Sequence, residues 1–493
     1  MKVDQYSGII HRIRTEAAAK DFYFVLRIQY RKDLALHINN GKTEEVSTAT
    51  TAGVGIQVIS PQGYMGFAAS DQISEAIAVE LFHKAAFLAD QGQFYSSESN
   101  QEVFQLEPLQ KKVTITERHP LGSISLENVE AKVKAINREL TDMDERLSVR
   151  TILRLSAEEW RIARSDGTDV SFNTPRSFLY HSITAKSATD TATAYANLPG
   201  TDLGIIIEAE SLERLRSRAH KAARLALELL GAPKLKSGNY KLVIDYALAK
   251  GLAHEAFGHA AETDALESSI LGEDGRLKVG LKVANEHLSI IDGPIEGDYA
   301  YQPVSAMGIE RKTVKIVDHG KLSAGLSDVF SARRAGVALT GAERVESFFS
   351  LPIARMTNIR IEYENALPMA GDFEAITPAD LYHFLVRHKL IEPQEKVLYL
   401  TGFQGGQVNP AFGDFVFHCS GIYALSETPV LYKPAIFSGK VLSVLDSVSA
   451  AIGPLQIDAM GTCGKMGQGV PSCGGSHYFL MINQNPEIMI GGE

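Results

Sequence analysis

Residues 34–70 read LALHINNGKTEEVSTATTAGVGIQVISPQGYMGFAAS. Apolar and polar residues alternate here in short runs, which is typical of strands that bury one face. Asn40-Gly41 and Gln62-Gly63 are turn signals between the runs, and Asn-Gly is a strong signal for a two-residue hairpin. The stretch therefore predicts antiparallel strands joined by tight turns.

Long amphipathic helices are expected on both sides of this stretch. Residues 8–30 predict a helix followed by a strand, and Ser74 is well placed to cap the helix predicted over SEAIAVELFHKAAFLAD. LENVEAKVKAINRELTDM at 126–143 and SLERLRSRAHKAARLALELLG at 211–231 carry the same helical periodicity, and Gly231 is a stop signal for the second.

Strands and helices come in blocks rather than in strict alternation, which favours an α+β fold with antiparallel-rich sheets and long helices. A hairpin is expected around Asp166-Gly167, and short strands with glycine turns dominate the C-terminal half. We predict three domains. They are an N-terminal α+β domain at 1–115, a central helix and hairpin region at 116–235, and a larger β-rich domain at 236–493.

Composition narrows the class of protein. The chain has 493 residues and a net charge of −10, and this acidic balance argues against nucleic-acid binding. No apolar run is long enough for a signal peptide or a membrane span, so we expect no membrane association. The three cysteines are too few for a disulfide framework, and the expected compartment is the reducing cytoplasm.

The segment most informative about chemistry is LAHEAFGHAAETD at 252–264, which contains His254-Glu255-x-x-x-His259. Two imidazoles flanking a carboxylate can supply two zinc ligands and a base beside a water molecule. In the usual His-Glu-x-x-His pattern the histidines lie one helical turn apart. Here the five-residue spacing would separate them by about 140° on an ideal helix. A bulge or break near Gly258 would restore convergence.

The motif alone leaves two questions open. A core helix with one buried and one surface histidine is an alternative interpretation. Further ligands could come from Glu262, Asp264 or the distant Cys463, which lies in a glycine-rich loop. A phosphate-binding loop is excluded there, because the P-loop pattern needs glycine and a hydroxyl residue where Ala459 and Met466 stand.

Five separated segments together resemble the TldD/PmbA family of bacterial metallopeptidases, and specifically its catalytic TldD branch. The PmbA (TldE) branch lacks the His-Glu-x-x-x-His helix. The matching segments are GVGIQVI…GYMGFAASDQIS at 53–74, HEAFGHAAETD at 254–264, ARMTNI at 354–359, GGQVNPAFGDFVF at 405–417 and GTCGKMGQGVP at 461–471.

The resemblance implies a role for each matching residue. His254, His259 and Cys463 correspond to the zinc ligands, and Glu255 corresponds to the catalytic glutamate. It also implies a cytoplasmic peptidase that cleaves flexible or unfolded peptides, in leader-peptide trimming or in peptide degradation. The expected assembly is a homodimer or a heterodimer with a PmbA/TldE-like subunit.

Several alternatives remain at the level of sequence. Zinc could be purely structural, with Cys473 or His477 as a fourth ligand, and the chain could bind peptides but act only in an assembly with a partner. Arg355 and Asn358 could orient a substrate or fix a strand end. The segment GGQVNPAFGDF at 405–415 could offer a strand edge to a peptide or form a plain loop.

One segment departs from the family pattern. AERVESFFSLPIA at 342–354 carries Phe348 and Phe349 where the family usually has more glycine and acidic residues. Because of this difference, the substrate and the partner of this chain need not be those of other family members.

Overall fold

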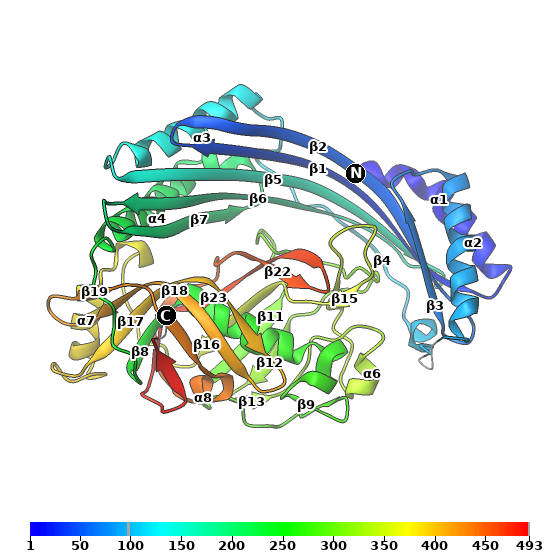
Figure 1. Ribbon diagram of the computed structural model, residues 1–493. Helices are drawn as coiled ribbons and strands as arrows, with labels where there is room; N and C mark the ends of the chain where they lie inside the picture. The colour runs from blue at the N-terminus through cyan, green and yellow to red at the C-terminus, as the bar shows by residue number, and fades with distance from the viewer. Residues whose placement is uncertain (96–98, 492–493) are drawn as a thin grey trace.

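The computed structural model describes residues 1–95 and 99–491 and has an α+β fold, as predicted (Figure 1). A long, curved sheet from the N-terminal half of the chain, coloured blue to green, arches over a second β-rich body from the C-terminal half. We call the first sheet the arch and the second layer the C-terminal body.

Within the described residues, the arch is a seven-stranded sheet in the order β3-β2-β1-β5-β6-β4, with β7 also paired to β6. The turns predicted at Asn40-Gly41, Gln62-Gly63 and Asp166-Gly167 all join neighbouring antiparallel strands. Asn40 and Gly41 have φ of 48° and 73°, as a tight hairpin turn that follows the strand twist requires. The strands are β1 (Tyr23–Asn39), β2 (Lys42–Ile59), β3 (Met65–Ser70), β4 (Gln110–Val113), β5 (Leu147–Arg164), β6 (Asp169–Lys186) and β7 (Thr191–Gly200).

Alternation along β1 gives the arch two different faces. Except for the exposed Lys32, its even-numbered residues are apolar or aromatic: Leu26 belongs to the core under α1 and α2, and Leu36 to the core under α3. Odd-numbered residues such as Arg31 and Asp33 lie on the opposite face, toward the C-terminal body. Ser74 caps α2 as predicted, because its Oγ accepts a hydrogen bond from the Ile77 amide at 3.2 Å. The helices are α1 (Ser7–Ala18), α2 (Glu75–Gly92), α3 (Leu126–Thr141) and α4 (Ala209–Glu228).

The C-terminal body is built on a thirteen-stranded sheet, again counted over the described residues, with β23, β8 and β17 at its centre. Most of its pairs are antiparallel, but β8 runs parallel to β17 and β16 runs parallel to β23. Its strands are β8 (Lys241–Asp245), β11 (Leu288–Gly293), β12 (Val314–Asp318), β13 (Lys321–Leu322), β16 (Asn358–Tyr363), β17 (Val397–Asn409), β18 (Asp414–Ala424), β19 (Val430–Tyr432), β20 (Ile436–Lys440), β21 (Val448–Gln456), β22 (Gly461–Lys465), β23 (Gln468–Ile482) and β24 (Ile488–Ile490).

Short elements complete the body. In the segment 405–415, for which a strand edge and a plain loop were both open, residues 406–409 at the end of β17 pair with residues 414–417 of β18. The remaining elements are α5 (Tyr246–Gly251), α6 (Ala332–Ala335), α7 (Pro378–Arg387), α8 (Val441–Asp446) and the two-stranded ladders β9 (Gly272–Glu273) with β10 (Arg276–Leu277) and β14 (Glu343–Arg344) with β15 (Ile353–Ala354).

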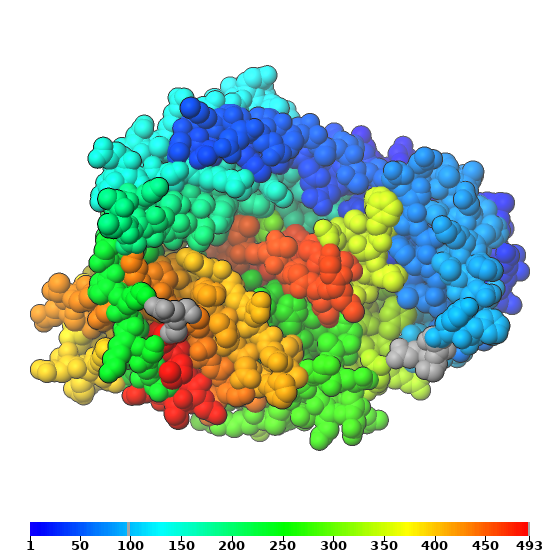
Figure 2. Space-filling model, in the orientation of Figure 1, coloured from blue at the N-terminus to red at the C-terminus, as the bar shows by residue number. Residues whose placement is uncertain are grey.

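Phe348 joins the two layers. Its side chain is fully buried against β2, where a Cβ on Gly53 would lie only 2.1 Å from the ring. Phe349 beside it is 57% exposed. The unusual Phe-Phe pair therefore packs the C-terminal body against the arch through its first member. Figure 2 shows the β22–β23 hairpin, in orange-red, at the surface between the two layers.

The predicted domain limits stay predictions. The arch takes strands from both 1–115 and 116–235, since β1 pairs with β5 and β4 pairs with β6. The C-terminal body falls within 236–493. Among the described residues, no helix combines the length and the apolar character needed to cross a membrane.

Candidate metal centre

The helix that carries the His-Glu-x-x-x-His motif changes its pitch at the motif. After α5, residues Leu252–Gly258 form a π-helical turn and His259–Ala261 a 3-10 turn. The His259 amide donates to the His254 carbonyl, which is the i to i−5 hydrogen bond of a π-helix. The extra residue in the turn brings positions five apart onto one face. The two rings lie 5.2 Å apart between centroids, so the distortion expected from the spacing is present.

Gly258 is needed for space rather than for unusual backbone angles. Its φ of −58° and ψ of −54° are open to any residue. A Cβ at this position, however, would lie 1.8 Å from Sδ of Met356 and 3.1 Å from Cδ1 of Ile359. The missing side chain lets the distorted helix sit directly on β16 and the residues before it.

We expect Gly258→Ala to destabilise the chain by about 1–3 kcal/mol, because overpacking a filled core costs that much. Urea unfolding followed by circular dichroism measures it. Gly464→Ala is the matched control, since a Cβ at Gly464 meets nothing within 4 Å. Equal unfolding midpoints for Gly258→Ala and the wild type would show that the contact with Met356 is not tight.

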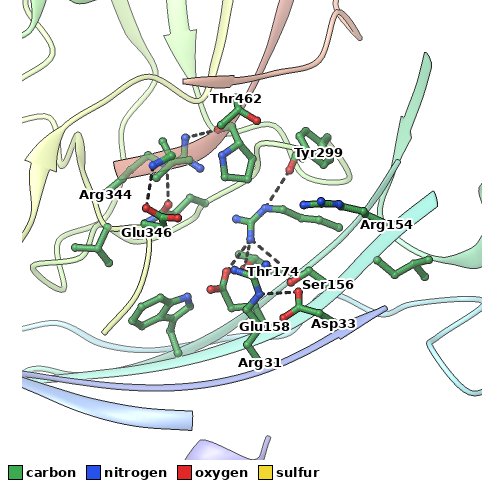
Figure 3. A pocket seen from close by; sticks show the side chains of 18 of the residues that line it. Arg31, Asp33, Arg154, Ser156, Glu158, Thr174, Tyr299, Arg344, Glu346 and Thr462 are labelled. Carbon is green, nitrogen blue, oxygen red and sulfur yellow. Dashed lines mark hydrogen bonds and ion pairs between the residues drawn. The ribbon is translucent and has the colours of Figure 1, made fainter. Parts of the chain in front are cut away.

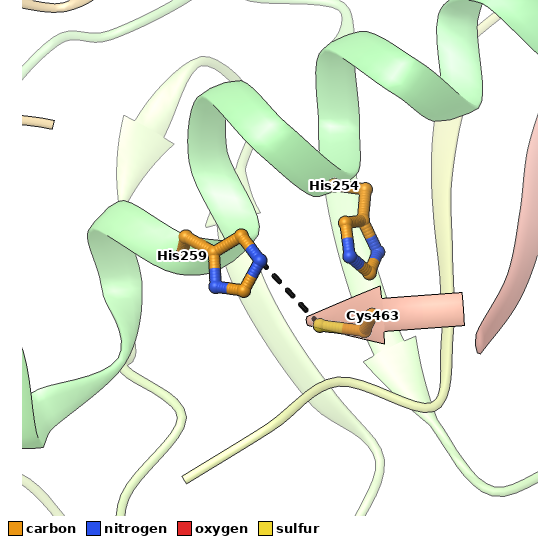
Figure 4. A group of neighbouring side chains, drawn as sticks. All are labelled: His254, His259 and Cys463. Carbon is orange, nitrogen blue, oxygen red and sulfur yellow. Dashed lines mark hydrogen bonds between the residues drawn. The ribbon is translucent and has the colours of Figure 1, made fainter. Parts of the chain in front are cut away.

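Cys463 completes the group from a distant part of the sequence (Figure 4). It lies on β22, and its Sγ is 3.4 Å from Nε2 of His259. One possible ligand atom from each of His254, His259 and Cys463 lies within 4.8 Å of the others. All three cysteines are free, so Cys463 forms no disulfide with Cys473.

Buried arginines fix the hairpin that carries Cys463. Arg355 donates to the carbonyls of Cys463 and Gln468, and Arg344 donates to the carbonyl of Pro471 at 2.5 Å. Of the two roles considered for Arg355, the structure therefore supports the structural one. The same holds for Asn358, whose amide donates to the Asp298 carboxylate and the Ile457 carbonyl, each at 3.1 Å.

Glu262 and Lys465 link the helix to the hairpin, and no role was predicted for Lys465. Glu262 accepts from Nδ1 of His259 at 3.0 Å and from Nζ of Lys465 at 2.8 Å. Lys465 also contacts both carboxylate oxygens of Asp264. Glu262 and Asp264 thus lie outside the ligand group, and Glu262 orients the His259 ring, as carboxylates commonly do behind metal-bound histidines.

These contacts set the charge of the three candidate ligands. Burial and the charge of Lys250 hold the pKa of His254 well below its usual value, which keeps the imidazole neutral. Burial lowers the pKa of His259, but the Glu262 carboxylate and the hydrogen bond with Cys463 raise it to about 10. Burial raises the pKa of Cys463, but the larger combined effect of His259 and Arg355 lowers it. The net result is a pKa below the usual value of a thiol, which favours the thiolate.

Glu255 lies on the same π-helical turn and is partly buried. Burial raises its pKa, while the charges of His259 and Lys250 act in the opposite direction. Lys250 itself is buried, and its Nζ donates to Oγ of Ser472 at 3.1 Å. The sequence analysis missed Lys250, although its place one turn before His254 would have signalled that it shares a helix face with the motif.

Cys473 and His477 have other partners. The Cys473 thiol is buried and lies 3.5 Å from the Ile457 carbonyl. Both ring nitrogens of His477 contact backbone, one with the Tyr363 amide and one with the Gly453 carbonyl. Over the described residues, the group that could hold a metal contains neither of them. The structure thus gives no support to a fourth protein ligand.

Three models of one family match the chain in order. They are the PmbA/TldA metallopeptidase domain 1 over residues 24–89, the central domain over 119–230 and the C-terminal domain over 237–473. All four of the motif residues His254, Glu255, His259 and Cys463 fall in the last match.

Known proteins resemble either nearly the whole chain or a little over half of it. A metalloprotease of Methanocaldococcus jannaschii is 28% identical over 91% of this chain and 93% of its own length. A protein of Saccharolobus solfataricus named zinc metalloprotease TldD homolog is 24% identical over 58% of this chain and 60% of its own. The solved structure of TldE from Thermococcus kodakarensis superimposes with a TM-score of 0.73 at 15% identity, covering 98% of this chain and 99% of that one.

Proposed function

Because the chain belongs to the PmbA/TldD family of metallopeptidases, we propose that it is a catalytic, TldD-like subunit that hydrolyses peptide bonds with zinc. The ligands in this proposal are His254, His259 and Cys463, and Glu255 is the catalytic base. The observation that carries it is that two imidazoles and one thiol converge to within 4.8 Å of one another, with Glu255 next to His254 on the same π-helical turn.

The residues present suit a metal. Nδ1 of His254 is buried and has no hydrogen-bond partner among the described residues, which is a costly state for a polar atom unless a further group binds the ring. Two nitrogens and a thiolate form a donor set that zinc accepts, and three protein ligands leave a position for water or substrate. The relative from Saccharolobus solfataricus, whose name includes zinc, supports this metal.

The chain's own groups supply the proton chemistry. Zinc, when bound, lowers the pKa of water and polarises a carbonyl oxygen. The Glu255 carboxylate accepts a proton from the attacking water and donates it to the nitrogen of the leaving amine. The raised pKa of Glu255 suits both steps. A carboxylate with a pKa closer to neutral pH accepts a proton from water more readily than an ordinary glutamate does, and it can still donate that proton to the amine. Glu262 holds the His259 ring in one orientation through Nδ1.

Our proposals for the substrate, the partner and the compartment rest on the resemblance to the family. We propose flexible or unfolded peptides as substrates, in leader-peptide trimming or peptide degradation in the cytoplasm. We propose that the chain works as a homodimer or with a PmbA/TldE-like subunit. The end of β17 beyond Leu400 pairs only with β18 among the described strands, which fits an extended peptide added along that edge.

Removal of the metal tests the proposal. We expect the purified chain with zinc to cleave an unstructured peptide, and 1,10-phenanthroline to reduce the rate by about 10²-fold or more, since metal assistance lowers the barrier by several kcal/mol. Added zinc should restore the rate. Cleavage that persists in metal-free protein would contradict the proposal. Zinc binding without cleavage, followed by cleavage once a PmbA-like partner is added, would support the alternative of a subunit active only in an assembly.

A further inference from the structure

A cavity of about 380 Å³ lies between the inner face of the arch and the hairpin that carries Cys463 (Figure 3). From the arch it is lined by the polar residues of β1 and β5 that the strand alternation turns inward, and from the C-terminal body by β14 and the β22–β23 hairpin. Apolar rings complete the wall: Trp160, Phe172 and Phe178. The cavity is thus part polar and part apolar, as sites for small ligands and peptide side chains usually are.

The charged groups of this cavity do not balance. Four arginines and three carboxylates line it: Arg31, Arg154, Arg176 and Arg344, with Asp33, Glu158 and Glu346. Two of the three carboxylates already form ion pairs with arginines of the cavity. Glu158 pairs with Arg176 at 2.8 Å, and Asp33 pairs with Arg31 at 2.7 Å.

The third carboxylate, Glu346, accepts from the Gly469 amide at 3.0 Å and forms no ion pair with any described arginine of the cavity, so four arginines and three carboxylates leave a net charge of +1. Two arginines are therefore left without an acidic partner. Arg344 is buried and donates only to the Gln302 side chain and to backbone carbonyls. Arg154 is exposed to the cavity and makes no hydrogen bond or ion pair with any described residue.

We infer that this cavity binds a carboxylate of a peptide, either an Asp or Glu side chain or the C-terminal group. The guanidinium of Arg154 is free to pair with it, and the buried guanidinium of Arg344 lines the same cavity. Guanidinium groups match carboxylates with two parallel hydrogen bonds. Trp160, Phe172 and Phe178 offer apolar contact to the atoms beside the carboxylate.

The cavity and the metal centre lie on opposite faces of one strand. Thr462 lines the cavity, while its neighbour Cys463 points to His259. Successive side chains of a strand point to opposite faces, so the two sites are separated by the thickness of the hairpin. The inference rests on the proposed peptidase function and makes the cavity a subsite for a part of the peptide away from the bond that is cut.

Binding to metal-free protein separates this inference from the proposed function. The probes are fluorescent unstructured decapeptides that differ in one group: a central Glu against Gln, and a free against an amidated C-terminus. We expect fluorescence anisotropy to show at least about tenfold tighter binding of one carboxylate form over its neutral match, the difference that a charged hydrogen bond provides. The preferred pair identifies which carboxylate is bound.

The decisive variant is Arg154→Leu, because Arg154 has no partner whose loss would unfold the chain. We expect it to abolish the preference for the carboxylate peptide. Arg150→Leu is the matched control, since Arg150 is an exposed arginine on the same face of β5 that does not line the cavity, and it should keep the preference. A wild-type protein that does not distinguish the peptides, or an Arg154→Leu protein that still does, would overturn the inference. Neither result depends on whether the zinc-loaded protein cleaves peptides.

Discussion

Glu255→Gln should retain the metal and lose peptide hydrolysis. The amide is nearly the same size as the carboxylate, so the π-helical turn and its ligands are expected to stay in place. It cannot accept the proton of the attacking water, and general-base catalysis of this kind contributes about 10²–10⁴-fold to the rate. The expected result is therefore a fall of that size in kcat/KM with zinc content unchanged, measured on the same preparation.

Glu267→Gln is a suitable control for the charge change. Glu267 follows the motif in the 3-10 segment Thr263–Ser268, and its side chain is 73% exposed. It should behave as the wild type in both measurements. A Glu255→Gln protein that cleaves peptides at the normal rate would show that another group is the base, and Glu262, which is buried behind His259, would be the next residue to test.

Cys463→Ala should lose zinc. The substitution removes the only thiolate of the proposed ligand set and leaves two imidazoles on one helical turn. Loss of a residue that merely supports a metal ligand already weakens binding by roughly 10–100-fold, so loss of the ligand itself should cost more than this. Zinc affinity is best measured by competition with a chromogenic chelator, and cleavage should disappear together with the metal.

Cys419→Ala separates this effect from the loss of a buried thiol. Cys419 is fully buried in the same apolar core, and its Sγ contacts the Ala435 carbonyl. This variant is expected to bind zinc as tightly as the wild type, even if it unfolds more easily. Similar zinc affinities for Cys463→Ala and Cys419→Ala would exclude Cys463 as a ligand.

Much of the fold follows from local patterns. The Asn40-Gly41 turn, the Ser74 cap and the alternation along β1 each specify a local structure, and all three are present. The arrangement of the layers depends on contacts between distant residues. Nothing near Gly53 in the sequence indicates that the ring of Phe348 will occupy the space its missing side chain leaves. The parallel pairing of β8 with β17 joins residues more than 150 positions apart.

In the candidate site, too, the local geometry could be predicted from the sequence, whereas the contacts between distant segments could not. The spacing of His254 and His259 required a local distortion, and the distortion is a π-turn. The place of Cys463 beside them came only from a family resemblance, because 204 residues separate it from His259. The supporting groups Lys465, Arg344 and Arg355 bind through backbone carbonyls or carboxylates of other segments. Such contacts leave no periodic signal in the sequence.

We propose that His254, His259 and Cys463 hold the zinc that makes this chain a peptidase. The most direct test measures zinc per chain and cleavage of an unstructured peptide in the same samples of wild type and Cys463→Ala. We expect one zinc per wild-type chain and the loss of both zinc and cleavage in the variant. A wild-type chain that binds no zinc, or a variant that retains zinc and cleavage, would contradict this proposal.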